Sequence, residues 1–331
     1  MLNQAAAPYP RLVGDVGGTH ARFGWVPEQG AGVTDVQAFA NKDHVGLEAV
    51  VSRYLEVRRW LSPASCAIGI ATAVTGDAIA MTNLDWSFSV DDLRRHIGVD
   101  RLLILNDYEA LAMALPTLGE RELRPIGRGS AVAVAGAPKA LLGAGTGLGV
   151  SGLLTVTGRF VPIVGEGGHI ALAPVDATED RLLSLLRGRF GRVSAERVLS
   201  GPGIENLYIA HCAIHGRTAE SLKAREITAR ALQGRDADCH HVVERFFAML
   251  GSFAGDLALT LGARGGVYVG GGIVPQLGDW IERSRFRERF EAKGRYRPYL
   301  AAIPTWLIND SSAAALQGAD RALDAFSLFG R

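Results

Sequence analysis

Apolar and polar positions along the chain follow two periodicities, and each periodicity predicts a different kind of secondary-structure element. Near the start, RLVGDVGGTHARFGWV predicts two short strands, at residues 12–13 and 22–26, joined by a glycine turn. The segments SCAIGIATAV and AIAMTN also predict strands, because their apolar residues run continuously or alternate between turn signals. By contrast, LEAVVSRYLEVRRWL (residues 47–61) carries apolar residues at helical spacing and predicts an amphipathic helix.

The middle of the chain repeats these elements. RLLILNDYEALAMALPTL predicts a buried strand at 102–105 and a helix that begins near Tyr108 and ends by Pro116. SAVAVAGAPKALLGAGTGLGVSGLLTV then predicts a strand, a loop and a second glycine-turned hairpin. The second hairpin therefore repeats the device with which the chain opens.

Helices are expected to dominate residues 179–262, with RVLSGPG as a break and RFFAMLGSFAGDLALTLG as the longest apolar helix. GGVYVGGGIVPQLGDWIERS predicts a strand, a glycine turn and a helix. PTWLIND predicts a last strand, and SSAAALQGADRALDAF predicts a last helix. Strands and helices mixed throughout in this way indicate the α/β class.

The length of the chain indicates two domains. A chain of 331 residues, 48% of them hydrophobic, exceeds the length at which single cores usually split. We expect a first domain of residues 1–116 plus 313–331, because the last helix can pack back on it. Residues 117–312 then form a second domain.

Charge and cysteine content narrow the class of partners. The formal net charge is +1, and we see no Lys/Arg-rich block that would attract nucleic acid or an anionic membrane. Cys66, Cys212 and Cys239 have no CxxC spacing, which suits a reducing cytosol. MLNQAAAPYPR lacks the pattern of a signal peptide, and no apolar run reaches membrane-spanning length. We therefore expect a cytoplasmic protein with small, soluble partners.

The two glycine turns are candidate anion sites. Backbone N–H groups at a glycine turn can form a concavity that binds phosphate, and both Gly17-Gly18-Thr19 and residues 143–149 have this character. The alternative is a pair of ordinary hairpin turns. Asp15 favours the phosphate interpretation for the first turn, provided that a Mg²⁺ ion, often bridged by water, lies between the carboxylate and the phosphate.

Three other motif readings are weak. Residues 147–152 match GxGxxG, but LLTVTGRFVPIV follows as a strand where a dinucleotide fold needs a helix. The chain contains no Gly-Lys dipeptide, which excludes the Walker P-loop. His211 and His215 are four residues apart, with Cys239, His240 and His241 downstream, yet no spacing resembles a structural zinc motif. Surface helix histidines are the better explanation for this last group.

A set of polar residues is a candidate catalytic constellation. Asn106 and Asp107 directly follow LLIL, so both lie at the carboxyl end of a predicted buried strand, where α/β folds bind ligands. Asn106 also fits a helix N-cap, with Glu109 completing a capping box, which leaves Asp107 as the better catalytic candidate.

The segment GEGGHIALAP places Glu166 and His169 around two glycines. A carboxylate and an imidazole at this spacing can bind neighbouring hydroxyls of one sugar, although such turns also expose polar groups without a catalytic purpose. Glu196, in SAERVLSGPG, could form an ordinary helix-surface pair, and taken alone it is interpreted as a structural residue.

Seven motifs in order carry a likeness to a known family. They are VGDVGGTHAR, AMTN, LNDYEALAMALP, GAGTGLGV, GEGGH, SAERVLSGPG and GGVYVGGGIVP. With them the chain resembles the bacterial glucokinases of the Escherichia coli type, which are ATP-dependent members of the hexokinase and actin-like ATPase superfamily. The resemblance implies a ribonuclease H-like actin-like ATPase fold, with a cleft between a small and a large α/β domain.

The same resemblance implies a residue-by-residue assignment of the site. DVGGT would be the first phosphate loop, GAGTGLG the second, and GGGIVP part of the adenosine site, with Asp15 reaching Mg²⁺ through water. Glucose would contact Asn106, Asp107, Glu166, His169 and Glu196, with Asp107 as the catalytic base. The residues implied to bind ATP are Gly14, Asp15, Val16, Gly17, Gly18, Thr19, Gly145, Thr146, Gly147, Gly271 and Gly272.

The implied reaction is phosphorylation of D-glucose by ATP at the 6-hydroxyl, the first step of glycolysis, and a homodimer is a family expectation. The alternatives are a sugar-sensing regulator without catalysis, which would need a DNA-reading module, and an actin-like ATPase or phosphatase without a sugar acceptor. A related family of sugar kinases and repressors has a zinc-binding cysteine cluster after its sugar histidine. IALAPVDATED has no cysteine, which favours the zinc-free branch.

Overall fold

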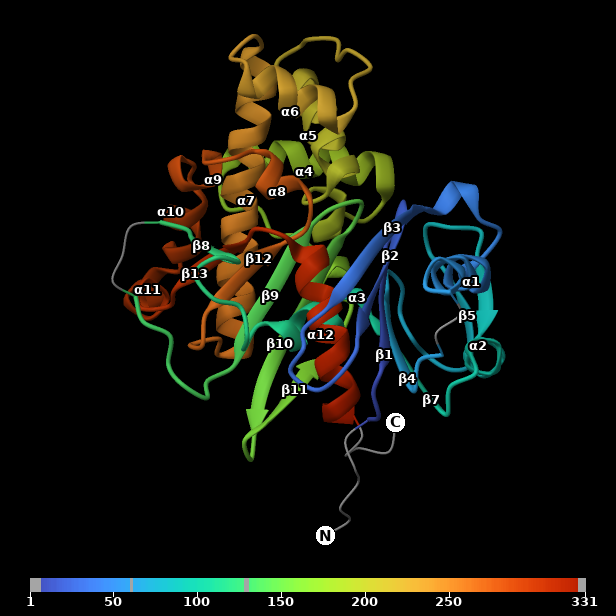
Figure 1. Cartoon of the computed structure of the whole chain (residues 1–331). Coiled ribbons are helices and arrows are strands. Elements are labelled where there is room, and N and C mark those ends of the chain that lie inside the picture. The colour runs from blue at the N-terminus through green and yellow to red at the C-terminus, as the bar shows by residue number, and fades with distance from the viewer. Residues whose placement is uncertain (1–6, 60–61, 128–130, 327–331) are drawn as a thin grey trace. The chain divides into compact units, whose positions relative to one another are not determined.

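Residues 7–59, 62–127 and 131–326 are described by the computed structural model of the chain (Figure 1). They group into two units of mixed strands and helices, so the α/β class predicted from the sequence is confirmed. Unit 1 comprises Met1–Gly119, Leu153–Val164 and Asp310–Arg331, and unit 2 comprises Glu120–Gly152 and Gly165–Asn309. Residues 1–6, 60–61, 128–130 and 327–331, which fall within predicted elements or domains, lie outside the described residues.

Unit 1 is built on a five-stranded sheet in the order β3-β2-β1-β4-β7. These strands are β1 (Arg11–Val16), β2 (His20–Val26), β3 (Thr34–Ala40), β4 (Ser65–Ile70) and β7 (Arg101–Asn106). β1, β4 and β7 run parallel, whereas β2 and β3 pair antiparallel. A small two-stranded sheet of β5 (Ala78–Ala80) and β6 (Ser87–Ser89) completes the strands assigned to this part of the chain.

The helices of unit 1 are α1 (Leu47–Val57), α2 (Val90–Ile97), α3 (Asp107–Ala114) and α12 (Ser311–Phe326), with a 3-10 turn η1 (Asn41–Asp43). The last helix, α12, packs against α3 and β1. At Gly318 a Cβ would collide with the carbonyl of Ala110, so glycine permits the close crossing of α12 and α3.

A buried arginine joins the first strand to the last helix. The side chain of Arg11 is fully buried, and its guanidinium pairs with Asp320 at 2.8 Å and Asp324 at 2.5 Å. Because a buried charge is stable only when it is paired and hydrogen-bonded, these contacts fix α12 on β1.

Unit 2 contains most of a six-stranded sheet in the order β11-β10-β9-β12-β13-β8. The strands are β8 (Leu123–Pro125), β9 (Lys139–Ala144), β10 (Leu148–Val156), β11 (Arg159–Ile163), β12 (Val267–Gly270) and β13 (Thr305–Ile308). β9, β12 and β13 are parallel neighbours. Residues 153–164, which the predicted division placed in the second domain, group with unit 1 because β11 contacts α3 and α12.

The longer helices of unit 2 are α4 (Ala177–Phe190), α5 (Gly201–Ile214), α6 (Ala224–Leu232) and α7 (Ala237–Leu261). Shorter segments are η2 (Gly167–His169), η3 (Ala195–Arg197), α8 (Ile273–Gln276), α9 (Trp280–Arg283), α10 (Phe286–Glu291), η4 (Gly294–Tyr296) and α11 (Arg297–Ala301). The predicted long apolar helix is α7, whose buried Phe246, Phe247 and Phe253 belong to the main core of the unit.

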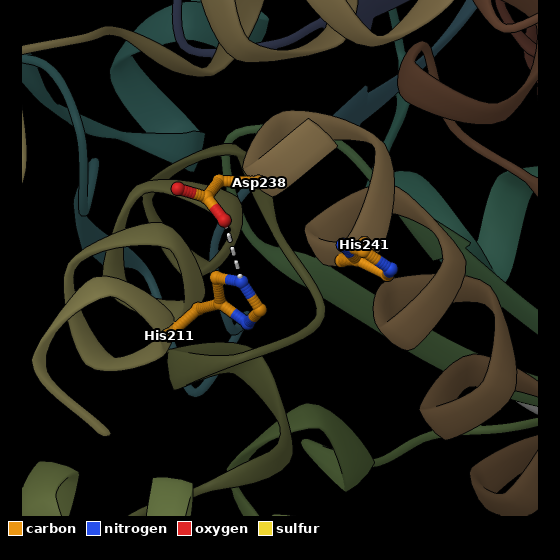
Figure 2. A group of neighbouring side chains, drawn as sticks. All are labelled: His211, Asp238 and His241. Atoms are coloured by element: carbon orange, nitrogen blue, oxygen red, sulfur yellow. Dashed lines mark hydrogen bonds and ion pairs between the residues drawn. The ribbon is translucent and has the colours of Figure 1, made fainter. Parts of the chain in front are cut away.

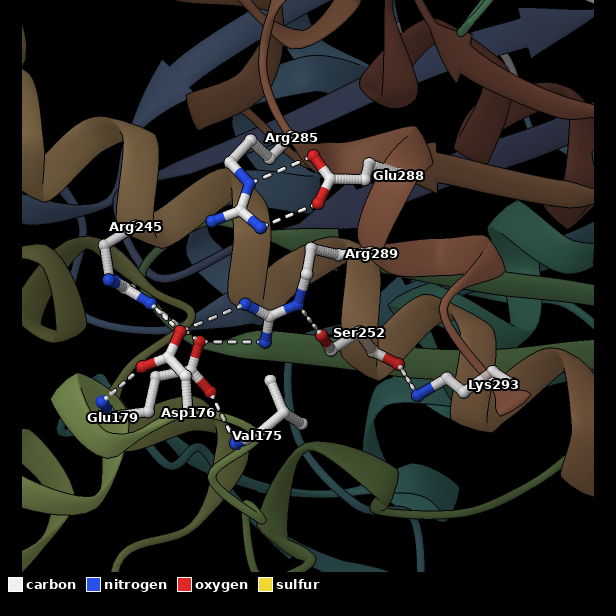
Figure 3. A network of polar contacts seen from close by, with 9 residues as sticks. All are labelled: Val175, Asp176, Glu179, Arg245, Ser252, Arg285, Glu288, Arg289 and Lys293. Atoms are coloured by element: carbon white, nitrogen blue, oxygen red, sulfur yellow. Dashed lines mark hydrogen bonds and ion pairs between the residues drawn. The ribbon is translucent and has the colours of Figure 1, made fainter. Parts of the chain in front are cut away.

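A buried ion network joins α4, α7 and α10 (Figure 3). Arg289 contacts Glu179 at 2.8 Å, and Arg245 contacts Asp176 at 2.5 Å. Only 1% of the Glu179 side chain is exposed, so both arginines are needed to compensate its charge. The network therefore fixes three helices of unit 2, none of which carries a predicted site residue.

One predicted strand is wrong. Residues 131–134, the described part of SAVAV, form no strand, and Val132 and Val134 are exposed by 77% and 38%. Their alternating pattern finds no partner strand in the described part of the sheet, where β9 lies between β10 and β12.

Of the helix predicted for residues 47–61, α1 covers the part up to Val57, and the positive φ of Arg59 ends it. None of the described helices is long and apolar enough to cross a membrane.

Candidate functional site

The first group of predicted site residues lies at the carboxyl ends of three parallel strands in unit 1. The register places Val16 beside Ile70, and Ile70 beside Asn106, so β1, β4 and β7 end together. The glycine loop that follows β1 and Asp107 after β7 therefore start from the same edge of the sheet. This is the edge at which α/β folds bind their ligands.

Asp15 is the buried carboxylate of this edge. It is 9% exposed, and the hairpin register sets it opposite Arg22, whose guanidinium lies 3.9 Å from the carboxylate. Burial raises the pKa of Asp15 to about 6, with a further increase from Asp310, against a decrease from Arg22. The guanidinium therefore leaves the charge of Asp15 incompletely balanced, which is the electrostatic setting that favours an additional cation.

The loop after Asp15 is held by its own turn and by η1. Gly17 N–H donates to the His20 carbonyl at 3.0 Å, and the Asn41 side-chain amide donates to the Gly17 carbonyl at 2.8 Å. A Cβ built at Gly17 would lie 3.7 Å from its nearest neighbour, the His20 oxygen. The fold itself therefore leaves room for a side chain at Gly17.

Gly14, by contrast, has a packing reason to be glycine. A Cβ at Gly14 would lie 2.7 Å from the ring of Phe23, and Val16 is itself fully buried in the core. Both residues hold the loop from within the sheet, and their assignment to the ATP site stays a prediction.

Asn106 caps α3, as the sequence predicted. Its Oδ1 accepts from the Tyr108 N–H at 2.9 Å, and its amide donates to the Thr72 carbonyl at 3.2 Å. Asp107 Oδ1 also accepts from the Tyr108 N–H, at 3.0 Å. Burial raises the pKa of Tyr108 above its ordinary value, and the carboxylates of Asp107 and Asp15 both add to the increase. The two candidate carboxylates of unit 1 thus act on one buried phenol.

The second group lies at the carboxyl ends of β9 and β12 in unit 2, where Gly143 pairs with Gly270. Gly271 has φ +83°, and a Cβ there would collide with the backbone of Ala144, so only glycine suits this position. The loop Gly145-Thr146-Gly147 and the Gly271-Gly272 pair therefore leave the sheet side by side. At Gly145 no atom lies within 4 Å of the position that a Cβ would take.

Gly145 provides a test of the phosphate-loop assignment. Gly145→Val is expected to raise the KM for ATP about tenfold or more, because the side chain has room in the fold but would intrude on a bound phosphate. The KM for glucose should change little, as should both constants in Gly188→Val, a control at an exposed helix glycine of the same unit whose Cβ would also meet nothing. A folded Gly145→Val protein with the parent KM for ATP would contradict the assignment.

Glu196 contacts this second loop directly. Its Oε2 accepts from the Leu148 N–H at 2.9 Å, and a Cβ at Gly147 would lie 2.5 Å from the same oxygen. The loop is also bonded to the start of α5, since Gly201 N–H donates to the Gly145 carbonyl at 2.9 Å. Glu196 therefore has a structural contact, as its sequence context taken alone indicated, but the partner is the backbone amide that opens β10, 48 residues away, rather than a neighbour on a helix surface.

Glu166 and His169 are exposed on the short η2 turn. The turn packs on β10, since a Cβ at Gly168 would collide with the Leu148 carbonyl. Ala195 N–H donates to the Ile170 carbonyl at 2.9 Å, so this segment also runs beside η3, which contains Glu196. Unit 2 therefore brings together the segments that carry three of the five predicted sugar contacts.

A comparison with known proteins identifies the family. The sequence pattern of the family described as Glucokinase matches residues 12–325. The chain belongs to the glucokinase family. It is 50% identical over 317 residues to a glucokinase of Aromatoleum aromaticum, with 96% of this chain and 95% of the relative covered. A glucokinase of Klebsiella pneumoniae is 46% identical, with 90% and 92% covered.

A solved structure agrees with this membership. The crystal structure of a glucokinase from an Antarctic psychrotroph has a TM-score of 0.85, 35% sequence identity, and covers 95% of this chain and 98% of its own. The family resemblance drawn from the seven motifs is therefore confirmed. For this glucokinase family member, the assignment of the two strand edges to ATP and sugar stays a prediction.

Three residues near the first edge were missed by the sequence reasoning. Arg22 faces Asp15 across the hairpin, Asn41 holds the glycine loop, and Asp310 acts on the pKa of Asp15. The sequence carried signals for Arg22 and Asp310. A hairpin that turns at residues 17–20 places residue 22 opposite residue 15, and WLIND repeats the LLILND pattern of an apolar strand followed by Asn-Asp. The sequence carried no such signal for Asn41, because its contact with the Gly17 carbonyl depends on where β3 brings the chain back to the glycine loop.

Proposed function

We propose that the chain transfers the γ-phosphoryl group of ATP to the 6-hydroxyl of D-glucose, giving glucose 6-phosphate and ADP. Membership of the glucokinase family supports this reaction. The observation that carries it is the edge of unit 1, where the glycine loop and Asp107 follow parallel strands that end together, with Asp15 in the last part of β1. A nucleotide-binding loop and a carboxylate base at one edge are the parts that phosphoryl transfer to an alcohol needs.

Asp107 is proposed as the base that orients the 6-hydroxyl and accepts its proton as the oxygen bonds to phosphorus. The backbone of Asp107 is fixed, because the residue opens α3 and packs closely on the adjacent strand. A Cβ at Gly69 of that strand would lie 3.4 Å from the Asp107 Cα and 3.2 Å from the Ala110 Cβ. In a loose transition state the protein contributes chiefly alignment and charge neutralisation, so a fixed position matters as much as basicity.

Mg²⁺ is proposed to accompany ATP, and the residues present fit it. Asp15 is a buried carboxylate with a raised pKa and only a distant arginine, which a nearby divalent cation would stabilise in its ionised form. Asp15 would hold the ion through water, and the ion would neutralise phosphate charge. The backbone amides of residues 18–19 and 146–147 would receive the phosphates, because the Gly17 and Gly145 N–H groups already donate within their own turns. Gly271 and Gly272 would lie at the adenosine.

Glu166, His169, Glu196 and Asn106 are proposed to hold the ring hydroxyls of the sugar. A site built from such hydrogen bonds discriminates strongly against a sugar that leaves them unpaired. Both polar atoms of the Asn106 side chain and one carboxylate oxygen of Glu196 already bond backbone groups of the fold. Glu166 and His169 are therefore the more specific sugar contacts. Closure of the small and large domains of an actin-like ATPase fold would exclude water, which is otherwise as good an acceptor.

The reaction is tested by ATP consumption with and without glucose, together with identification of glucose 6-phosphate. We expect consumption to depend on glucose and to match the sugar phosphate formed. Equal ATP loss without glucose would indicate an ATPase, and glucose binding without any ATP loss would indicate a sugar sensor.

The sugar contacts are tested separately. Glu166→Gln and His169→Ala are each expected to lower kcat/KM for glucose by about ten- to a hundredfold, because a hydrogen bond to a charged group contributes about 1.5–3 kcal/mol. Both residues are exposed on η2, so the variants should fold, and the KM for ATP should stay near that of the parent. Glu120→Gln, at an exposed position of the same unit, is the control. Normal kcat/KM in both variants would place the sugar elsewhere.

A further inference from the structure

A second cluster of metal-ligating side chains lies in unit 2, and the proposed phosphoryl transfer does not use it (Figure 2). His211 comes from the last turn of α5, while Asp238 and His241 come from the first turns of α7. One ligand atom from each of the three lies within 4.8 Å of the others. His211 Nε2 and Asp238 Oδ1 are already 3.1 Å apart.

We propose that His211, Asp238 and His241 bind one divalent transition-metal ion, best represented by Zn²⁺. Two imidazoles and one carboxylate are a donor set that suits Zn²⁺, Co²⁺, Ni²⁺ and Cu²⁺, whereas Mg²⁺ and Ca²⁺ prefer oxygen ligands alone. Three protein ligands leave a fourth position for water or another small ligand. The site is therefore distinct in both place and metal preference from the Mg²⁺ expected with ATP.

The distances are compatible with such an ion. Zn–N and Zn–O bonds of about 2.0–2.2 Å set tetrahedral ligand atoms about 3.4 Å apart. The His211–Asp238 pair is close to this spacing, and His241 is exposed on the helix surface, where a change of rotamer can bring its ring nearer. The backbone of the two α7 ligands is fixed, because Asp236 caps the helix through the Asp238 N–H at 2.9 Å and the Cys239 N–H at 3.0 Å.

The surroundings favour a cation over an anion. The three residues line a pocket of about 500 Å³ together with His215, Arg217 and other side chains. Each arginine that lines this pocket is paired with a carboxylate: Arg217 with Asp238, Arg245 with Asp176, and Arg285 with Glu288. The imidazoles are thus the groups of the pocket best placed to bind a ligand. His215 supports the arrangement, since its Nδ1 bonds the His211 carbonyl at 2.9 Å.

Two features explain why spacing along the chain did not indicate this site. Cys239, one of the residues weighed as a ligand from the sequence, is fully buried and takes no part, and the carboxylate ligand Asp238 belongs to no metal-binding spacing. Arg217 competes with a metal ion for Asp238, because the two side chains form an ion pair. Since 49% of the Arg217 side chain is exposed, it can move aside. Since α5 begins at the second glycine loop, a bound ion would also fix the helix that holds that loop.

The test is titration of the full-length, untagged, chelator-treated protein with Zn²⁺ by calorimetry, and with Co²⁺ by visible absorption. We expect one equivalent to bind with the absorption of a tetrahedral site, and thermal unfolding to shift upward up to one equivalent. His241→Ala should weaken binding at least tenfold. His240→Ala is the matched control, because His240 is also exposed on α7 but lies outside the cluster.

A complementary variant removes the competing cation. Arg217→Ala should bind Zn²⁺ at least as tightly as the parent, whereas Asp238→Asn should bind it at least tenfold more weakly. The buried thiols of Cys66, Cys212 and Cys239 do not compete in the folded protein. The proposal is overturned if the parent binds no equivalent of either metal, if His241→Ala binds as the parent does, or if Arg217→Ala loses affinity.

Discussion

Asp107→Asn is expected to lower kcat for glucose phosphorylation by about 10²–10⁴-fold, the usual effect of removing a general base. Asparagine keeps the size of the side chain and an oxygen that can accept from the Tyr108 N–H, so α3 should still begin at this residue. Glucose affinity, read by calorimetry, should therefore survive while turnover falls. A loose transition state needs a base only late, so the lower end of the range is expected if alignment dominates.

The control for this experiment is Asp100→Asn, which changes an exposed aspartate just before β7 and should leave both constants unaltered. If kcat of the folded Asp107→Asn protein stays within about tenfold of the parent, below the usual general-base range, Asp107 only positions the sugar.

Asp15→Asn is expected to lower kcat/KM for MgATP by about 10- to 100-fold, the usual cost of losing a group that holds a metal through its outer shell. The same substitution should stabilise the protein without ligand. The pKa of Asp15 is raised from 3.8 to about 6, so the carboxyl group supports the fold fully below about pH 4, and this support is lost as the pH rises through about 6. Asparagine does not ionise and keeps its contribution.

At neutral pH the gain for Asp15→Asn is at most about 3 kcal/mol, since one pKa unit corresponds to about 1.4 kcal/mol. Urea denaturation of both proteins without nucleotide or Mg²⁺, at about pH 5 and about pH 7.5, measures it as a difference that grows with pH. A parent more stable than the variant at both pH values would show that Asp15 is a structural carboxylate. A rise in stability together with loss of MgATP use would show a carboxylate kept for function.

What the sequence predicted well is local. The hairpin of β1 and β2, the N-cap at Asn106 and the α7 helix each depend on residues a few positions apart, whose turn signals and periodicity are visible in the chain. The residues alone already made Asp107 a catalytic candidate and Glu166 with His169 candidate sugar contacts. The family motifs added their specific roles toward glucose, which stay predictions.

What the sequence could not predict depends on distant partners. Glu196 bonds the backbone amide that opens β10, 48 residues away, and Asp310 influences Asp15 only because α12 returns the chain to the first sheet. The apolar alternation of residues 131–134 predicted a strand, but a strand forms only where a neighbour offers its backbone. His211 is likewise distant along the chain from Asp238 and His241, and only the fold brings the three side chains into one cluster.

The pairing of Arg11 with Asp320 and Asp324 also affects the order in which the parts of the chain can fold. These partners are 309 and 313 residues apart, so β1 emerges first, and the helix that neutralises its buried arginine emerges last. Unit 2 ends at Asn309, so all of its residues precede α12 along the chain, whereas unit 1 is complete only with α12. We therefore expect the inner part of the chain to fold before the amino-terminal part. Until then Arg11 remains hydrated and β1 lacks the cover of α12, the stage at which a nascent chain most needs protection from aggregation.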